Sequence, residues 1–251
     1  MSAHFEKAER FKNEGRFDEA IDELRLALRL DPGCTEAILG LAHLFYLSKQ
    51  LPESISSFIH AEARGAKLDA EDLFILGEAY AAKSFHRKAI ESYDRSLALA
   101  DQADTHFARG TSFLKLQEFD NAAQCYLNVL RLNPDNTEAH FSLASVLAEK
   151  GDFSKALVEY EEWITTQQGN AWARHCVAVA QLNTGNPSGA LEEVRTILCD
   201  NPQDSQAFFV QGCAYSSIGN IAQAIEALEN CLKFNTHHPL ALVLLTHLHR
   251  I

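Results

Sequence analysis

Two groups of residues have side chains that could do chemistry. His175 and Cys176 are neighbours, and an imidazole beside a thiol can act as the base that activates a nucleophile. Consecutive residues of a helix do not face each other, so this thiol gains no base from adjacency, and we interpret it as buried. The second group is four histidines near the end of the chain that could hold a metal ion. The last two are two residues apart on a predicted helix, so their side chains point in different directions and do not form a metal site together. The group comprises His237, His238, His247 and His249.

Short motifs of common enzyme classes are absent from the sequence. It contains no G-x4-G-K phosphate loop, no H-E-x-x-H zinc motif and no G-x-S-x-G nucleophile elbow. We therefore expect a protein that is not an enzyme and that needs neither a cofactor nor a metal.

The charge of the chain is spread along its whole length. The 251 residues carry a formal net charge of −12, with 15 basic and 21 acidic residues up to Cys125 and 7 basic and 13 acidic residues after it. Nucleic-acid binding needs a basic surface that replaces phosphate counterions, and no basic stripe is visible. A basic or mainly apolar protein partner fits this chain better.

The cysteines and the N-terminus indicate a reducing compartment. The 6 cysteines have irregular spacing and no C-x-x-C pair, which argues against a zinc clip or a disulfide framework, and we interpret them as small buried hydrophobic residues. The first residues already read as a helix without an apolar signal core, and no apolar run is long enough to cross a membrane. We expect a cytoplasmic protein without membrane insertion.

A small residue recurs every 33 to 35 positions inside a matching apolar frame. This period predicts seven pairs of amphipathic helices of about 14 residues each, which must stack because one pair cannot bury its own apolar face. We expect a single solenoid over residues 1–251. Its units are 1–34, 35–69, 70–102, 103–136, 137–170, 171–204 and 205–238, followed by a C-terminal helix at 239–251. The recurring residues are Ala20, Ser54, Ala89, Ala122, Ala156, Ala190 and Ala224.

Turn and packing signals agree with this division. Gly15 marks a tight turn inside the first unit, and Asp31-Pro32 ends its second helix, because proline cannot continue a helix. Small residues in each first helix, such as Gly77, stand opposite large apolar residues in the second helix, such as Tyr93, which predicts knobs set into holes.

The frame resembles the tetratricopeptide repeat family over nearly the whole chain. The motifs that carry the resemblance are Leu76-Gly77-(x2)-Tyr80, Arg109-Gly110-(x2)-Phe113 and Gln211-Gly212-(x2)-Tyr215. The resemblance implies an all-α, right-handed superhelical solenoid of seven helix-turn-helix repeats that serves as a surface for holding other proteins. The sequence departs from the family pattern where it has histidine in place of an aromatic residue and serine in place of alanine. These departures are His4, His106, His140 and Ser54.

In this family the first helix of each repeat lines the concave wall of the superhelix. The residues expected to face that groove, at the fifth place of each unit, are Phe5, Leu39, Phe74, Phe107, Phe141, His175 and Phe209. This column favours an apolar peptide or an amphipathic helix as ligand, although the same rings could simply cover the seam between helices. Acidic residues at the second place, such as Glu36, complement the helix dipole, and would favour basic flanks on the partner if they also rim the groove.

The joint between the fifth and sixth units is the least regular. Trp163 occupies a place that other units fill mostly with small residues, residues 165–170 lack the closing proline, and Trp172 replaces an acidic residue. We expect a bend or a partner hot spot here, with locally compensated drift as the alternative. The predicted partner-binding residues are Phe74, Phe107, Phe141, Trp172, His175 and Phe209.

The C-terminal helix is apolar on more than one side. Four residues cannot all face inward, namely Leu242, Val243, Leu245 and Leu248, so the helix is a self-association surface, a truncated eighth unit, or a cap with one apolar side. We therefore expect a non-catalytic adaptor or scaffold that holds a partner in its groove. The alternatives are a self-assembling scaffold that uses the C-terminal helix and a regulatory domain of a larger enzyme.

Overall fold

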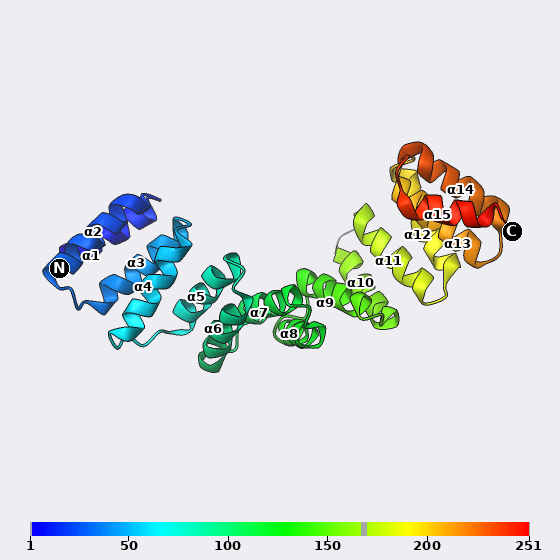
Figure 1. Ribbon diagram of the computed structural model, residues 1–251. Coiled ribbons are helices and arrows are strands. Elements are labelled where there is room, and N and C mark those ends of the chain that lie inside the picture. The colour runs from blue at the N-terminus through cyan, green and yellow to red at the C-terminus, as the bar shows by residue number, and fades with distance from the viewer. Residues whose placement is uncertain (1, 167–169, 251) are drawn as a thin grey trace. The chain divides into compact units, whose positions relative to one another are not determined.

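The computed structural model describes residues 2–166 and 170–250, and over these ranges the regular secondary structure is entirely α-helical (Figure 1). Gln167, Gln168 and Gly169, which the sequence places in the irregular joint, lie outside the described residues, as does Ile251 of the predicted C-terminal helix. The helices are α1 (Ser2–Asn13), α2 (Phe17–Leu30), α3 (Thr35–Leu47), α4 (Leu51–Ala63), α5 (Ala70–Ala82), α6 (His86–Leu99), α7 (Ala103–Lys115), α8 (Phe119–Leu132), α9 (Thr137–Glu149), α10 (Phe153–Thr166), α11 (Ala171–Asn183), α12 (Pro187–Asp200), α13 (Ser205–Ser217), α14 (Ile221–Phe234) and α15 (Pro239–Leu248).

Consecutive helices pack as pairs, from α1 with α2 to α13 with α14, and neighbouring pairs stack on each other within each unit. The chain forms two compact units that are larger than the repeats, Met1–Pro134 with four pairs and Asp135–Ile251 with three pairs and α15. From here on, the first and the second unit mean these two parts of the chain, and the helix pairs are called repeats. The predicted all-helical repeat fold is confirmed. That both units belong to one continuous solenoid stays a prediction.

Each pair is closed by a tight turn with one left-handed residue. Gly15 has φ 74°, and the amide of Arg16 donates to the carbonyl of Phe11 at 2.8 Å, so the turn satisfies the end of α1 in the manner of a Schellman motif. Lys49 takes the corresponding place after α3 with φ 63°. The turn is therefore a property of the repeat, and glycine makes it easier to form without being required.

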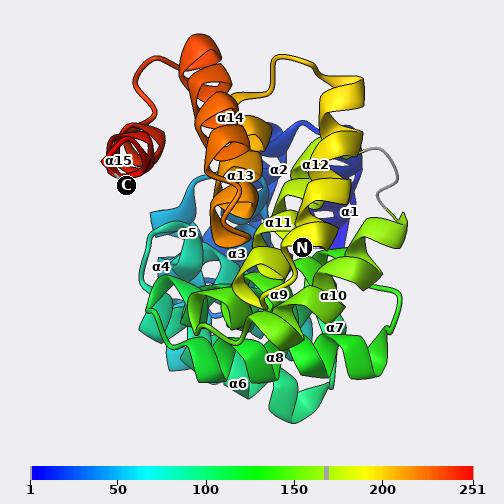
Figure 2. The ribbon, with the colours of Figure 1, turned by 90° about the vertical axis from the view of Figure 1, so that its right-hand side faces the viewer.

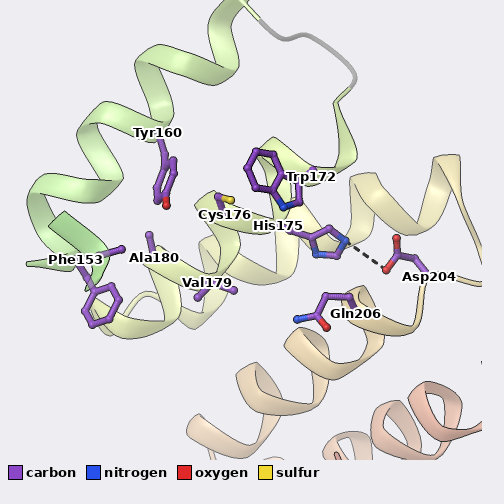
Figure 3. Close-up of a pocket in the computed structure, with 10 residues that line it drawn as sticks. Phe153, Tyr160, Trp172, His175, Cys176, Val179, Ala180, Asp204 and Gln206 are labelled. Carbon is purple, nitrogen blue, oxygen red and sulfur yellow. Dashed lines mark ion pairs between the residues drawn. The ribbon is translucent and has the colours of Figure 1, made fainter. Parts of the chain in front are cut away.

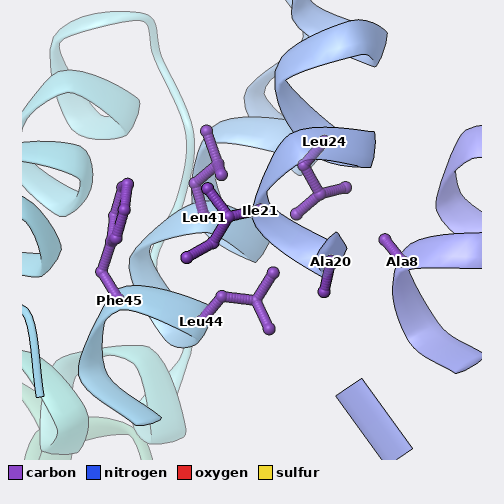
Figure 4. Packing of buried hydrophobic residues seen from close by; sticks show 7 residues of the cluster. All are labelled: Ala8, Ala20, Ile21, Leu24, Leu41, Leu44 and Phe45. Atoms are coloured by element: carbon purple, nitrogen blue, oxygen red, sulfur yellow. The ribbon is translucent and has the colours of Figure 1, made fainter. Parts of the chain in front are cut away.

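The recurring small residues form the innermost layer of the core. All seven, Ala20 to Ala224, have no solvent exposure, and they lie where two helix backbones meet. In the first unit Ala20 lies among larger side chains of its neighbours, including Leu24 and Leu44 (Figure 4). Tyr93 is equally buried and covers Gly77, where an added Cβ would come within 2.6 Å of the Tyr93 ring. The predicted knobs and holes are thus present.

The departures from the family pattern each gain a polar partner. His4 contacts Glu23 at 2.6 Å and His106 contacts Asp101 at 2.7 Å, so the imidazoles are held by carboxylates where an aromatic ring would otherwise pack. The hydroxyl of Ser54 donates to the carbonyl of Ala42 at 2.8 Å, which satisfies a polar group with no solvent exposure. The substitutions therefore leave the helix pairs intact.

The interpretation of all six cysteines as buried is wrong for one of them. Cys125 and Cys231 are buried, Cys34, Cys176 and Cys213 are partly buried, and Cys199 is exposed. Cys199 lies in the last turn of α12.

Helix α15 packs against α14 and buries Ala241 and Leu248 (Figure 2, in which α15 is seen nearly end-on). Leu240 and Val243 remain 61% and 69% exposed. The helix therefore has an apolar side that lacks a cover. Among the described helices, none is both long and apolar enough to cross a membrane.

Replacing Gly77 with Ala should lower the free energy of unfolding by about 1–3 kcal/mol, because the new methyl group collides with a fully buried tyrosine ring. Urea unfolding followed by circular dichroism measures this change. The matched control is Gly40→Ala in α3, where the nearest atom is the mobile end of Leu24 and the change should stay within about 1 kcal/mol. Equal losses in both variants would contradict the proposed interlock.

Candidate functional site

The phenylalanines of the predicted column are half-buried, and those of the third, fourth and fifth repeats pack on the tyrosine of their own second helix. Ring centroids lie 6.0 Å apart for Phe74 and Tyr93, and 5.4 Å apart for Phe107 and Tyr126. Each ring thus fills part of the seam between helices and keeps part of its surface in solvent. The two interpretations of the column, packing and ligand binding, are compatible in the same residue.

Four aromatic rings meet at the joint between α10 and α11. Measured between ring centroids, Phe141 lies 4.7 Å from Trp163 and 4.6 Å from Trp172. The centroid of Tyr160 lies 6.2 Å from that of Phe141. Trp163 is only 7% exposed and belongs to the core, whereas Trp172 is 52% exposed. The bulky Trp163 therefore fills this joint from inside, and Trp172 rests on the filled layer. The predicted bend stays a prediction.

The start of α11 is held by a local cap. The side chain of Asn170 accepts hydrogen bonds from the amides of Trp172 and Ala173 at 3.0 and 3.4 Å. Such a cap satisfies amides that have no partner inside the helix. It places Trp172 in the first turn of α11 with its ring on the Phe141 side.

A cavity of about 420 Å³ opens beside Trp172 (Figure 3). Phe153 and Tyr160 lie at one end, Cys176, Val179 and Ala180 line the middle, and Trp172 lies near the other end. The lining comes from α9, α10, α11 and the start of α13, all within the second unit. Its full set is Ala148, Phe153, Tyr160, Trp172, His175, Cys176, Val179, Ala180, Asp204 and Gln206.

Polar groups gather at the α13 end of the cavity. The Nε2 atom of His175 lies 3.3 Å from Oδ1 of Asp204, and the same oxygen accepts the amide of Ala207 at 2.9 Å as the N-cap of α13. In the described part of the chain, Oδ2 of Asp204 has no hydrogen-bond or ion-pair partner, and the carboxylate meets no lysine or arginine. The cavity thus combines an apolar body with one acidic end.

The cavity lacks an activated nucleophile. Burial raises the pKa of the Cys176 thiol to about 11, so the reactive thiolate is scarce near neutral pH. His175 lies 3.3 Å from Asp204, while the thiol of Cys176 lies near Tyr160, so neither group activates the thiol. In residues 2–166 and 170–250, no group of three His, Cys, Asp or Glu side chains is arranged to hold a metal ion. The arrangement is suited to binding an apolar group.

The structure brings together three of the six predicted site residues, Phe141, Trp172 and His175. Phe209 lies on α13, where its ring centroid is 4.5 Å from that of His238. Phe74 and Phe107 belong to the first unit. Sequence reasoning missed Val179 and Asp204. Val179 shares a helix face with Trp172 and His175 at spacings of seven and four residues, a signal that would have found it.

A smaller hollow lies at the other end of the phenylalanine column. Its volume is about 250 Å³, and Phe5, Leu24 and Leu44 form its apolar part. Glu36 is on its lining, so this first-turn acid does border a groove besides lying at the start of α3.

Comparison with protein families matches two models described as tetratricopeptide repeat. One covers residues 5–66 and 107–171 and the other covers residues 205–238. A TPR repeat-containing protein of Methanocaldococcus jannaschii is 27% identical over 159 residues, which are 60% of this chain and 28% of that protein. DnaJ homolog subfamily C member 3 of Gallus gallus is 22% identical over 204 residues, 75% of this chain and 40% of that protein. The matched regions thus span less than half of these relatives.

Solved structures show the same fold. The C-terminal part of a TPR repeat-containing protein from Cytophaga hutchinsonii superposes with a TM-score of 0.77 at 14% identity, covering 96% of this chain and 99% of that one. YrrB, described as a TPR protein with an unusual peptide-binding site, has a TM-score of 0.66 at 20% identity over 73% of this chain and 93% of its own.

The two tryptophans should differ in their response to acrylamide, because Trp172 is half exposed and Trp163 is buried. We expect a quenchable and a protected part of the fluorescence, and Trp172→Phe should remove the quenchable part. Emission that stays fully quenchable in this variant would place Trp163 in solvent and contradict the core position assigned to it.

Proposed function

Because the chain belongs to the tetratricopeptide repeat family, we propose that it is a non-catalytic adaptor that holds a peptide or an amphipathic helix of a partner protein on the faces of its first helices. The cavity beside Trp172 takes an apolar side chain of that partner as its main anchor. Phe209, which lies in the same compact unit, extends the contact surface, and Phe74 and Phe107 offer apolar contacts of their own within Met1–Pro134.

The observation that carries this proposal is a large aromatic residue left in solvent on a rigid support. Trp172 is 52% exposed although its ring lies 4.6 Å from Phe141, which packs on the buried Trp163. Exposed tryptophans beside apolar cavities are typical of interface hot spots, because a ligand can bury them without reordering the protein. The family supports the same use, since YrrB is described as having a peptide-binding site.

The test uses peptides selected from a random display library on the purified chain. Trp172→Ala and Val179→Gln should each weaken the selected peptides by about tenfold to a hundredfold, because both changes remove apolar contact at the cavity. Fluorescence anisotropy of labelled peptides measures the dissociation constants.

The matched control for these two variants is Val158→Gln. Val158 is 57% exposed on the second helix of its pair and does not line the cavity, so its replacement should leave the affinity unchanged. Peptides that bind all three variants as tightly as the parent chain would refute the cavity as the anchor site.

Self-assembly is a second candidate, favoured by the uncovered apolar side of α15. Leu240 and Val243 are the largest exposures among the leucines and valines of that helix, and burying such side chains against another chain is favourable.

If α15 mediates assembly, the mass measured by light scattering should rise with protein concentration, and Val243→Gln should abolish that rise. Val158→Gln again serves as control, because it makes the same polar replacement on a different helix. A concentration-independent monomer mass would eliminate this candidate and leave the adaptor function untouched.

A further inference from the structure

We infer that the cavity selects an aromatic side chain that carries or adjoins a positive charge, with the ring between Tyr160 and Trp172 and the cation at Oδ2 of Asp204. The inference rests on the proposed function, and it specifies the chemistry of the anchor that the adaptor accepts.

The apolar body of the cavity fits a flat ring. Tyr160 and Phe153 stand at one end and Trp172 near the other, with Val179 and Ala180 between them (Figure 3). An aromatic ligand can make tilted or edge contacts with rings on both sides, each of which adds to the gain from burial. An aliphatic side chain of the same size would bury its surface without these ring contacts.

The acidic end of the cavity needs a positive group. The side chain of Asp204 is 17% exposed, and its contacts with other described residues, His175 and the amide of Ala207, both use Oδ1. Its Oδ2 is therefore the acceptor available to a ligand, since a carboxylate can accept several hydrogen bonds. A ligand that covers this oxygen without donating to it would leave it desolvated and unpaired, which is costly.

His175 does not supply that positive group when its imidazole is neutral. A neutral imidazole whose Nε2 lies 3.3 Å from Oδ1 carries no charge and leaves the negative charge of the carboxylate in place. The N-terminus of α13 offsets this charge only partly, because a helix end carries about half an elementary charge. A ligand ammonium would complete the balance and could also lie over the exposed Trp172 ring.

Three small compounds separate the ring from its charge. Phenethylamine carries the ring and an ammonium, phenethyl alcohol carries the ring and a neutral hydroxyl, and hydrocinnamate carries the ring and a carboxylate. For ligands of this size we expect a dissociation constant of about 1 mM for the amine. The alcohol should bind about five times more weakly than the amine, and hydrocinnamate more weakly still. Tryptophan fluorescence and chemical shifts of the cavity residues measure the binding.

Asp204→Asn tests the carboxylate without removing the helix cap, since asparagine caps helices about as well as aspartate. It should weaken phenethylamine by about threefold to tenfold and leave phenethyl alcohol unchanged. The matched control is Asp69→Asn, which makes the same replacement at the N-cap of α5, a residue that does not line the cavity. Thermal unfolding of both variants checks that the helices remain folded.

Equal binding of the amine and the alcohol to the parent chain would overturn the inference, and so would an Asp204→Asn variant that binds the amine as well as the parent does. In both cases the apolar anchor site of the proposed function would still stand, because the ring alone binds. Failure of both ring compounds to bind in the cavity would overturn the inference and would also count against the cavity as an anchor site.

Discussion

The close approach of two helix backbones at each small residue is the constraint on which the rest of the structure depends. Positions such as Ala20, Ala89 and Ala224 have no exposure because the facing helix occupies the space that a larger side chain would need. The ring of Tyr93 can then cover Gly77 and fill the contact between α5 and α6. Since one pair cannot bury its apolar face alone, the stability of each pair depends on its neighbours.

The candidate site arises where this pattern is modified and not where it is strictly repeated. Trp163 takes a position that most other repeats fill with a small residue. Together with Phe141 it fills the joint, so the layer of side chains beneath Trp172 is closely packed. A ring supported in this way loses little freedom when a ligand covers it. The residue that makes the joint irregular thereby supports the exposed ring on which the proposed binding site depends.

The acidic residues of the chain serve two different purposes. Glu23 and Asp101 hold histidines at 2.6 and 2.7 Å and so stabilise the packing where the aromatic residue of the pattern is missing. Asp204 caps α13 and contacts His175 through one oxygen, and among the described residues neither contact uses its other oxygen. Charge at the cavity is therefore a local feature, although the net charge of −12 also favours the approach of basic partners.

The sequence by itself determined the helix pairs, their turns and the small residues at their contacts, because a repeat of fixed length forces the same local packing in each repeat. It singled out Trp172 and His175 as predicted binding residues, yet it misplaced Cys199 and did not single out Val179 or Asp204. Only the tertiary structure decided that Asp204 lies beside His175, 3.3 Å away, with Trp172 and Tyr160 around one cavity. The physical reason is that these residues lie on helices of different pairs, and the way such helices pack depends on the volumes of the side chains between them, which spacing along the chain does not encode.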